Sequence, residues 1–309
     1  MQPTSNGLAP LTHLGVIAVQ GDEAAKFLHS QLTQDFALMA PDQARLAAFC
    51  SAKGRMQASF IGLRWTDGQL LLVCARDLLA PTLKRLSMFV LRAKAKLRDA
   101  TEEFQLLGAM GASATALLGG EQAPWHRREA AGGVAVALYP ADGQPRALLV
   151  LPAQAALPDT VGSAPPLPLE AWQLSEVRSG VVLLGQALFE VLVPQMLNYE
   201  SVGGVSFKKG CYPGQEVVAR SQFRGTLKRR AYLVHADAEL AAGQEVFLGT
   251  EPEQPSGTVV QAAPHPAGGW DAMVSVQIAA AEAGDLHAAS ADGPALQLQP
   301  LPYALLADV

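Results

Sequence analysis

The sequence predicts an α+β protein that ends in a small all-β domain. Before residue 100, the order of apolar runs and helical spacings is strand, helix, strand, strand, strand, helix, which is typical of α+β folds with mostly antiparallel pairing. Beyond Arg230 the apolar runs are short and separated by Gly, Pro and Asp, which is typical of a β-sandwich or β-barrel. With 309 residues, the chain is long enough for two or three subdomains.

The first hundred residues give the clearest elements. Apolar, β-branched stretches predict strands at residues 14–19, 45–50, 57–64 and 69–75. After the first strand, Asp22 is the expected N-cap of an amphipathic helix that runs to Leu32. Apolar residues at helical spacing predict a second helix over residues 77–91.

The later part of the chain divides at two places. Five prolines fall between residues 152 and 168, and such a stretch holds no regular element, so we expect a connector between subdomains there. The pattern changes to short β runs close to Arg230. We therefore expect one domain over residues 1–228 and a C-terminal domain over residues 229–309.

Composition excludes several classes of protein. Half of the residues are apolar and 17% are charged, which indicates a globular chain. The start shows no secretory signal, and Gln186 and Glu190 interrupt the most apolar stretch, residues 181–193. Because a membrane span needs about 18 uninterrupted apolar residues, we expect a soluble cytoplasmic protein without membrane contact.

The three cysteines, Cys50, Cys74 and Cys211, show no regular spacing, and the sequence has no CxxC pair. An odd number of cysteines argues against a disulfide framework. We expect no metal site, because neither a zinc site nor a cluster held by four thiolates within one chain is indicated.

Cations are segregated in two runs, although the net charge is −5. Residues 208–230 hold seven cations and one acid, and residues 84–98 hold six cations and no acid. Such clusters on an acidic chain favour a local anionic ligand. Two solvated surface faces would account for them equally well.

Residues 203–230 carry the chemistry that the sequence suggests. Residues 205–207 are interpreted as the end of a strand, Pro213-Gly214 as a turn, and Gln215 as the start of a helix. Cys211 thus stands beside two lysines and just before a helix N-terminus, and both neighbours favour a reactive thiolate. The alternative is a buried, inert cysteine, which is the common state of free cysteines.

Residues 209–216, KGCYPGQE, match the KGCYxGQE signature of the YgfZ family. The chain resembles this family at further places from end to end: GDEAAKFLHSQLTQD at 21–35, AFCSAKGRM at 48–56, PQMLN at 194–198 and PLPYAL at 300–305. Five motifs in the same order make chance a poor explanation of the resemblance.

The resemblance implies a fold and a function. YgfZ-like proteins are relatives of the glycine-cleavage T-protein, with two interlocked α+β lobes and a C-terminal antiparallel β-barrel around a central channel. They bind tetrahydrofolate. The cationic runs of this chain would suit the anionic tail of its polyglutamylated form. They act as accessory proteins for iron–sulfur cluster assembly or repair, including support of tRNA methylthiolation. The implied partners are iron–sulfur enzymes or assembly factors.

The resemblance also assigns site residues. Cys211 and Lys209 are the residues on which the activity of the family depends, and Trp172 stands where the family has a folate-contacting tryptophan. The expected folate site comprises Trp172, Leu14, Arg178, Gln215, Glu216, Arg220 and Arg224. Leu14 occupies the place of a second family tryptophan, so one stacking wall is absent.

Two other functions compete with this prediction. A folate-dependent aminomethyltransferase needs a carboxylate near the folate amine, but the T-protein segment that carries it is matched here by residues 54–59, GRMQAS, and its Arg-x-Glu by Glu176-Val177-Arg178. An RNA-binding protein would use the basic runs, yet no RNA-binding motif is present. Direct nucleic-acid binding is therefore not expected.

Overall fold

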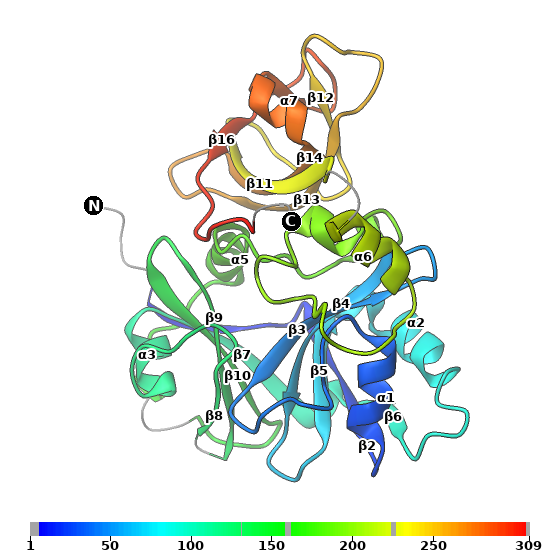
Figure 1. Cartoon of the computed structure of the whole chain (residues 1–309). Coiled ribbons are helices and arrows are strands. Elements are labelled where there is room, and N and C mark those ends of the chain that lie inside the picture. The colour runs from blue at the N-terminus through cyan, green and yellow to red at the C-terminus, as the bar shows by residue number, and fades with distance from the viewer. Residues whose placement is uncertain (1–5, 131, 158–161, 224–226, 307–309) are drawn as a thin grey trace.

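Three antiparallel sheets make up most of the protein (Figure 1). This computed structural model describes residues 6–130, 132–157, 162–223 and 227–306. Two sheets form the lower part of the molecule in Figure 1, and the third lies above them. All strand pairs within the three sheets are antiparallel, so the predicted α+β class and pairing are confirmed.

The first lobe is a five-stranded sheet with two helices on one face. Its strands in spatial order are β3 (Ala44–Cys50), β4 (Met56–Arg64), β5 (Leu70–Ala75), β2 (Leu14–Gln20) and β6 (Lys96–Asp99). In β2, Ile17 and Val19 share a core with the helices α1 (Ala24–Gln31) and α2 (Arg76–Ser87). Val16 and Ala18 pack instead toward the second sheet, because successive side chains of a strand point to opposite faces.

The second lobe is built around another five-stranded sheet. Its strands in spatial order are β1 (Gly7–Pro10), β7 (Phe104–Met110), β10 (Gln144–Pro152), β9 (Gly133–Ala141) and β8 (Arg127–Ala130). The turn η1 (Thr101–Glu103) leads into it, and α3 (Ala112–Leu118) shares a core with its other face. β1 precedes β2 in the chain but pairs with β7, so the two lobes interlock.

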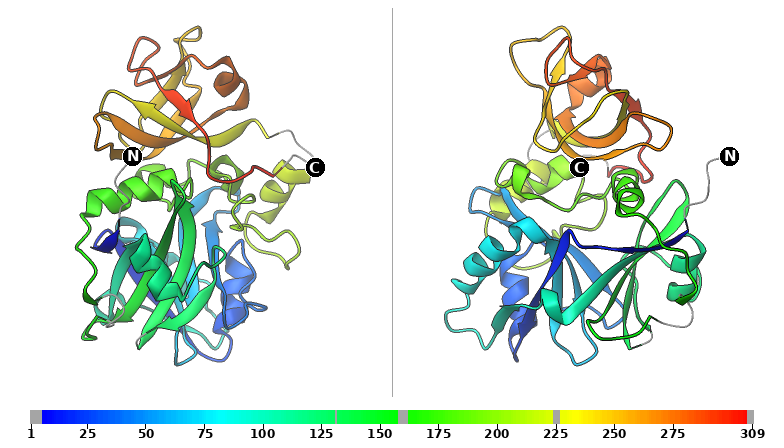
Figure 2. Two further views of the ribbon diagram at one scale, coloured as in Figure 1. Left: turned by 90° about the vertical axis from the view of Figure 1, so that its left-hand side faces the viewer. Right: turned by 180° about the vertical axis from the view of Figure 1, so that it is seen from behind.

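The chain between the second sheet and the C-terminal sheet is largely irregular. Residues 153–157 and 163–168 of the proline-rich stretch hold only turns and an isolated bridge before α5 (Leu169–Arg178). Two short 3-10 turns, η2 (Gln186–Leu188) and η3 (Pro194–Leu197), separate α5 from α6 (Gln215–Phe223). In both views of Figure 2, α5 and the part that holds η2, η3 and α6 lie between the lobes and the C-terminal sheet.

The C-terminal sheet curls into a half-barrel (Figure 2). Its strands in spatial order are β15 (Leu286–Ala288), β12 (Glu245–Leu248), β13 (Gly257–Pro264), β14 (Trp270–Gln277), β11 (Arg229–Ala236) and β16 (Gln297–Gln299). Helix α7 (Ile278–Ala283) joins its apolar core. This arrangement agrees with the expected C-terminal antiparallel barrel. The central channel stays a prediction.

The predicted strands in the first lobe are confirmed, but two helix ends are wrong. The residue that precedes α1 is Glu23 and not Asp22, and Glu23 forms no side-chain cap. Its carboxylate instead accepts the N–H of Lys94, at 2.8 Å. α2 ends at Ser87, four residues before the predicted end at Leu91.

The predicted strand end at residues 205–207 is also wrong. These residues are irregular, and the N–H of Ser206 donates to the carbonyl oxygen of Thr33 at 2.9 Å instead of to a neighbouring strand. A tertiary contact therefore satisfies the backbone here.

Among the residues that the structure describes, no helix is both long enough and apolar enough to cross a membrane.

Candidate functional site around Cys211

Residues 208–214, here called the motif loop, contain a buried cation. Lys209 is 8% exposed, and its Nζ donates to the carbonyl oxygens of His29 and Leu32 at the C-terminal end of α1. Its Nζ also lies 4.5 Å from the centre of the Tyr212 ring. The last carbonyls of a helix lack partners within the helix and attract cations. Burial lowers the pKa of Lys209 to about 8, although the negative charges of Asp35 and Cys211 act to raise it.

The turn at residues 51–55 packs closely against the motif loop. A Cβ on Gly214 would lie 2.4 Å from the carbonyl oxygen of Ser51, and a Cβ on Gly54 would lie 2.9 Å from Cβ of Val217. Both glycines also have positive φ, +79° and +72°. Only glycine fits both demands, so the motifs at 48–56 and 209–216 are neighbours in space.

The motif at residues 21–35, which contains α1, binds the chain just before the motif loop. Thr33 Oγ1 donates to the carbonyl oxygen of Gly204, and Gln34 Nε2 donates to that of Gly203, both at 2.7 Å. The ring of His29 shares a 2.9 Å hydrogen bond with Asp35, and its Nε2 would lie 3.4 Å from a Cβ on Gly210. Three of the five motifs therefore meet at one loop.

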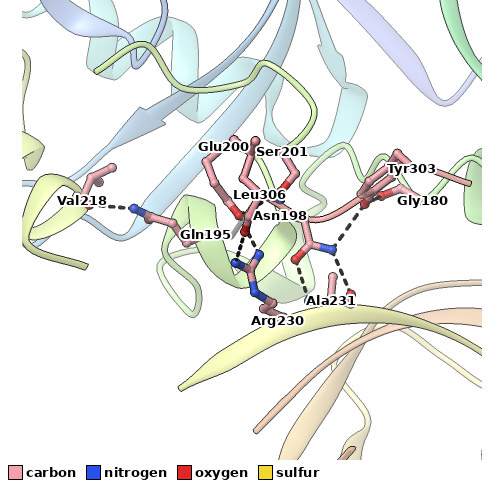
Figure 3. A network of polar contacts seen from close by, with 10 residues as sticks. All are labelled: Gly180, Gln195, Asn198, Glu200, Ser201, Val218, Arg230, Ala231, Tyr303 and Leu306. Carbon is pink, nitrogen blue, oxygen red and sulfur yellow. Dashed lines mark hydrogen bonds and ion pairs between the residues drawn. The ribbon is translucent and has the colours of Figure 1, made fainter. Parts of the chain in front are cut away.

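The fourth and fifth motifs join this unit through the network drawn in Figure 3. Gln195 Nε2 donates to the carbonyl oxygen of Val218 in α6 at 2.6 Å. The side-chain amide of Asn198 bonds both backbone groups of Ala231 in β11. The hydroxyl of Tyr303 accepts a hydrogen bond from Asn198 at 3.3 Å. Buried polar groups of this kind fix one arrangement of the backbone.

A buried ion pair in the same network fixes the start of the C-terminal sheet. Arg230 Nη1 lies 2.7 Å from Glu200 Oε1, and both side chains are less than 10% exposed. Arg230 Nη2 also donates to the carbonyl oxygen of Leu306 at 2.9 Å. Removing one partner of such a pair would leave a buried charge uncompensated.

The three cysteines have different surroundings. Cys211 is exposed, whereas Cys50 and Cys74 are buried in β3 and β5. Burial raises the pKa of each of these two thiols to about 12. Because the thiolate is the nucleophile and the metal ligand, Cys211 is the thiol that the fold leaves available.

Two residues predicted for the folate site lie in the core. Trp172 in α5 is 1% exposed and Leu14 is 4% exposed. The guanidinium of Arg146 lies 4.4 Å from the centre of the Trp172 ring, and a Cβ on Gly108 would lie 2.4 Å from the same ring. A folate ring could stack on Trp172 only if Arg146 moved.

Arg178, also predicted for folate, links α5 to the C-terminal sheet. Its Nε donates to Asp271 at 2.7 Å and its Nη1 to Asp142 at 2.6 Å. Burial alone would lower the pKa of Arg178, but these two hydrogen bonds outweigh it and raise that pKa. Asp271 also shares a 2.8 Å hydrogen bond with His235.

The other predicted folate residues lie on or near α6. Glu216 and Arg220 are exposed and line one shallow hollow together with Phe223, while Gln215 is half-buried at the start of the helix. Arg224 lies outside the described residues. In Figure 1, the helix α6 lies apart from α5, which carries Trp172.

Sequence reasoning missed a group of side chains near Trp172. Arg146 is 3% exposed and donates to Ser175 Oγ at 2.8 Å, and burial lowers its pKa to about 10. The half-buried rings of Tyr139 and Tyr303 lie 5.6 Å apart, and that of Trp125 lies 5.9 Å from Tyr139. No local pattern marks these residues, although PLPYAL contains Tyr303.

No group of three or more His, Cys, Asp or Glu side chains in the described part of the chain is arranged to hold a metal ion.

Comparison with known proteins identifies the family. Residues 3–124 match the family described as GCVT N-terminal domain. The aminomethyltransferase T of the Bartonella henselae glycine cleavage system has the same fold, with a TM-score of 0.71 at 19% identity over 97% of this chain and 87% of that one. The tRNA-modifying protein YgfZ of Shigella sonnei (strain Ss046) is 31% identical over 98% of this chain and 97% of its own length. That of Escherichia coli (strain K12 / DH10B) matches with the same identity and coverage. The chain therefore belongs to the YgfZ family.

Proposed function

We propose that the chain supports tRNA modification as a folate-binding accessory protein for iron–sulfur proteins, and that Cys211 is its working group. The observation that carries this proposal is the exposed Cys211 on a loop that two other motifs, at residues 21–35 and 48–56, contact directly. The similarity to tRNA-modifying YgfZ proteins supports the link to tRNA modification.

The chemistry available to Cys211 is that of one accessible thiol. A thiolate can bind one iron atom or attack an electrophilic sulfur. Iron–sulfur clusters are usually held by four thiolates, and the other two cysteines of this chain are buried. We therefore propose that the cluster is cargo, and that a client enzyme or assembly factor supplies its remaining ligands.

We further propose that tetrahydrofolate binds at the junction of the second lobe and the C-terminal tail. The half-buried rings of Tyr139 and Tyr303 contact each other edge to face, and an aromatic ligand ring could pack against this pair, because aromatic rings prefer contacts with centres about 4.5–7 Å apart. Among the described residues, the indole N–H of Trp172 is buried without a hydrogen-bond partner, and an acceptor atom of a bound ligand could satisfy it. These residues would hold the folate, which brings a reduced pterin and an anionic glutamate tail.

The structure offers no support for aminomethyl transfer. At the position of the T-protein carboxylate the chain has Ala58 and Ser59, and the buried Ser59 hydroxyl accepts the N–H of Leu184 at 2.7 Å. Arg178, which takes the place of the T-protein glutamate, is bonded to Asp271 and Asp142. Neither position offers a general base to a folate amine.

Complementation tests the working group. In cells that lack their own YgfZ protein, Cys211→Ser should fail to restore tRNA methylthiolation, whereas Cys50→Ser and Cys74→Ser should restore most of it. The modified nucleoside is measured by mass spectrometry of bulk tRNA. Full restoration by Cys211→Ser would refute the proposal for this thiol.

Folate binding is tested separately by calorimetry with tetrahydrofolate. Tyr139→Ala should weaken binding about tenfold or more, because stacking and burial of the ring are lost. Phe223→Ala, on the exposed face of α6, is the matched aromatic control and should leave binding unchanged. Equal affinity of Tyr139→Ala and the parent protein would rule out this position of the folate.

A further inference from the structure

A cavity of about 420 Å³ lies where the C-terminal sheet meets the irregular segment after α5. Residues 187–196 contribute an apolar lining that includes Leu188, Leu192 and Met196. The C-terminal sheet contributes Arg229 from β11, with Glu245 and Thr258, and Arg55 comes from the turn before β4. Cavities that bind small molecules combine such apolar linings with a few polar groups.

The two arginines in this lining, Arg55 and Arg229, differ from the neighbouring Arg230 in their partners. Both are half-buried, and within the described part of the chain neither forms an ion pair. Arg55 Nη1 donates to the backbone oxygen of Val191, and the side chain of Arg229 forms no hydrogen bond in that same part of the chain. Glu245 lines the cavity too, but it pairs with neither guanidinium. By contrast, Arg230, the next residue in β11, is bonded to Glu200.

The charges of the two arginines also act on each other. Burial lowers the pKa of Arg229, and the charge of Arg55 lowers it further. Both guanidinium groups stay protonated at neutral pH, because arginine does not lose its proton in proteins. Two like charges at one partly buried cavity repel each other and are incompletely hydrated, and an anion between them would relieve both costs.

We propose that this cavity is a binding site for a small amphipathic anion. A carboxylate or phosphate group would lie between Arg55 and Arg229, whose planar donors match the oxygens of both anions. An aliphatic or aromatic body would contact Leu188, Leu192 and Met196. The volume of about 420 Å³ fits a small molecule, since ligand pockets measure about 300–1,000 Å³. The proposal is independent of Cys211 and of folate.

Calorimetry of the full chain with simple probes tests the site. Octanoate and octyl phosphate carry both features of the proposed ligand and should bind. Acetate and inorganic phosphate, which lack the apolar chain, should bind at least about tenfold more weakly. Octylamine, which reverses the charge, should give no measurable heat. Binding of octylamine as tight as that of octanoate would overturn the proposal.

Substitution of Arg229 assigns the site to these residues. Arg229→Met should weaken octanoate binding at least about tenfold, because a charge-assisted hydrogen bond is lost. Its stability should change little, since Arg229 has no internal partner in the described chain. Arg55→Met should also weaken binding, with thermal unfolding to confirm that the turn survives. Arg92→Met, an exposed arginine outside the cavity, removes the same charge and should leave affinity unchanged. Unchanged octanoate affinity in both Arg229→Met and Arg55→Met would overturn the assignment.

Discussion

The sheet of the first lobe and the motif loop both contain cysteines, but different forces hold the two regions in place. β3, β4 and β5 are regular, and apolar side chains cover both faces of their sheet, so Cys50 and Cys74 are simply part of the core. The motif loop has no regular structure, and buried polar contacts and glycines hold it in place. The fold thus makes two thiols inert and leaves the third exposed.

The two regions should therefore respond differently to mutation. A sheet core tolerates apolar exchanges of similar volume. An irregular loop depends on single contacts that no other residue type reproduces, such as the close approach of Gly214 to the carbonyl oxygen of Ser51. Mutations should therefore have sharper effects in the loop than their number of apolar contacts would suggest.

The largest expected effect is on thiol reactivity. At pH 8, iodoacetamide should label Cys211 at least about 100-fold faster than Cys50 or Cys74, because a buried thiol with a pKa of about 12 is almost entirely protonated at that pH. Peptide mass spectrometry over a time course measures the three rates. Labelling of Cys50 or Cys74 at the rate of Cys211 in the folded protein would remove the distinction between the two regions.

A smaller effect is expected where the motif loop meets the turn at residues 51–55. Gly214→Ala should lower the free energy of unfolding by about 2–4 kcal/mol, because positive φ and a clash with the Ser51 carbonyl act together. Gly68→Ala is the matched control: its φ is +91°, but no atom lies within 4 Å of the added Cβ. Gly68→Ala should cost about 1 kcal/mol, which is the penalty of the positive φ alone. Equal losses in a urea titration would show that the close approach is unimportant.

The regular elements could be predicted because their signal is local. The strands of the first lobe follow from short apolar runs, and β2, β3, β4 and β5 begin or end within one residue of expectation. Helix ends failed because they depend on distant partners. Glu23, for example, bonds to Lys94, which is remote in sequence.

The candidate site was predictable only in part for the same reason. Cys211 is exposed, while its reactivity stays a prediction, and the burial of Lys209 depends on carbonyls of α1 that lie more than 170 residues away in the chain. Trp172 was expected to present a ring face to folate, whereas Arg146 and Gly108 cover it. A strand residue such as Arg146 carries no sign in the sequence that it will be buried on an indole.

At neutral pH, Lys209→Met should have the smallest effect on the free energy of unfolding. The pH dependence of this effect is the sharper test. The variant loses charged hydrogen bonds but also the cost of burying a charge, so we expect a net loss of about 1 kcal/mol. Lys208→Met, at the exposed neighbour, should stay within about 0.5 kcal/mol of the parent.

The sign of the pH dependence follows from the lowered pKa of Lys209. Between pH 8 and 10.5, the folded parent protein has released the Lys209 proton while the unfolded chain retains it. Stability rises with pH wherever the unfolded state binds more protons. The parent should therefore gain stability relative to Lys209→Met over this window, although titration of the buried thiols lowers the stability of both proteins equally. Urea titrations of both proteins at pH 7, 8.5 and 10 measure the difference. The difference in the free energy of unfolding between the parent and Lys209→Met should grow with pH. If it stays constant or decreases, Lys209 is hydrated in the folded protein, and the motif loop is held no differently from an ordinary surface loop.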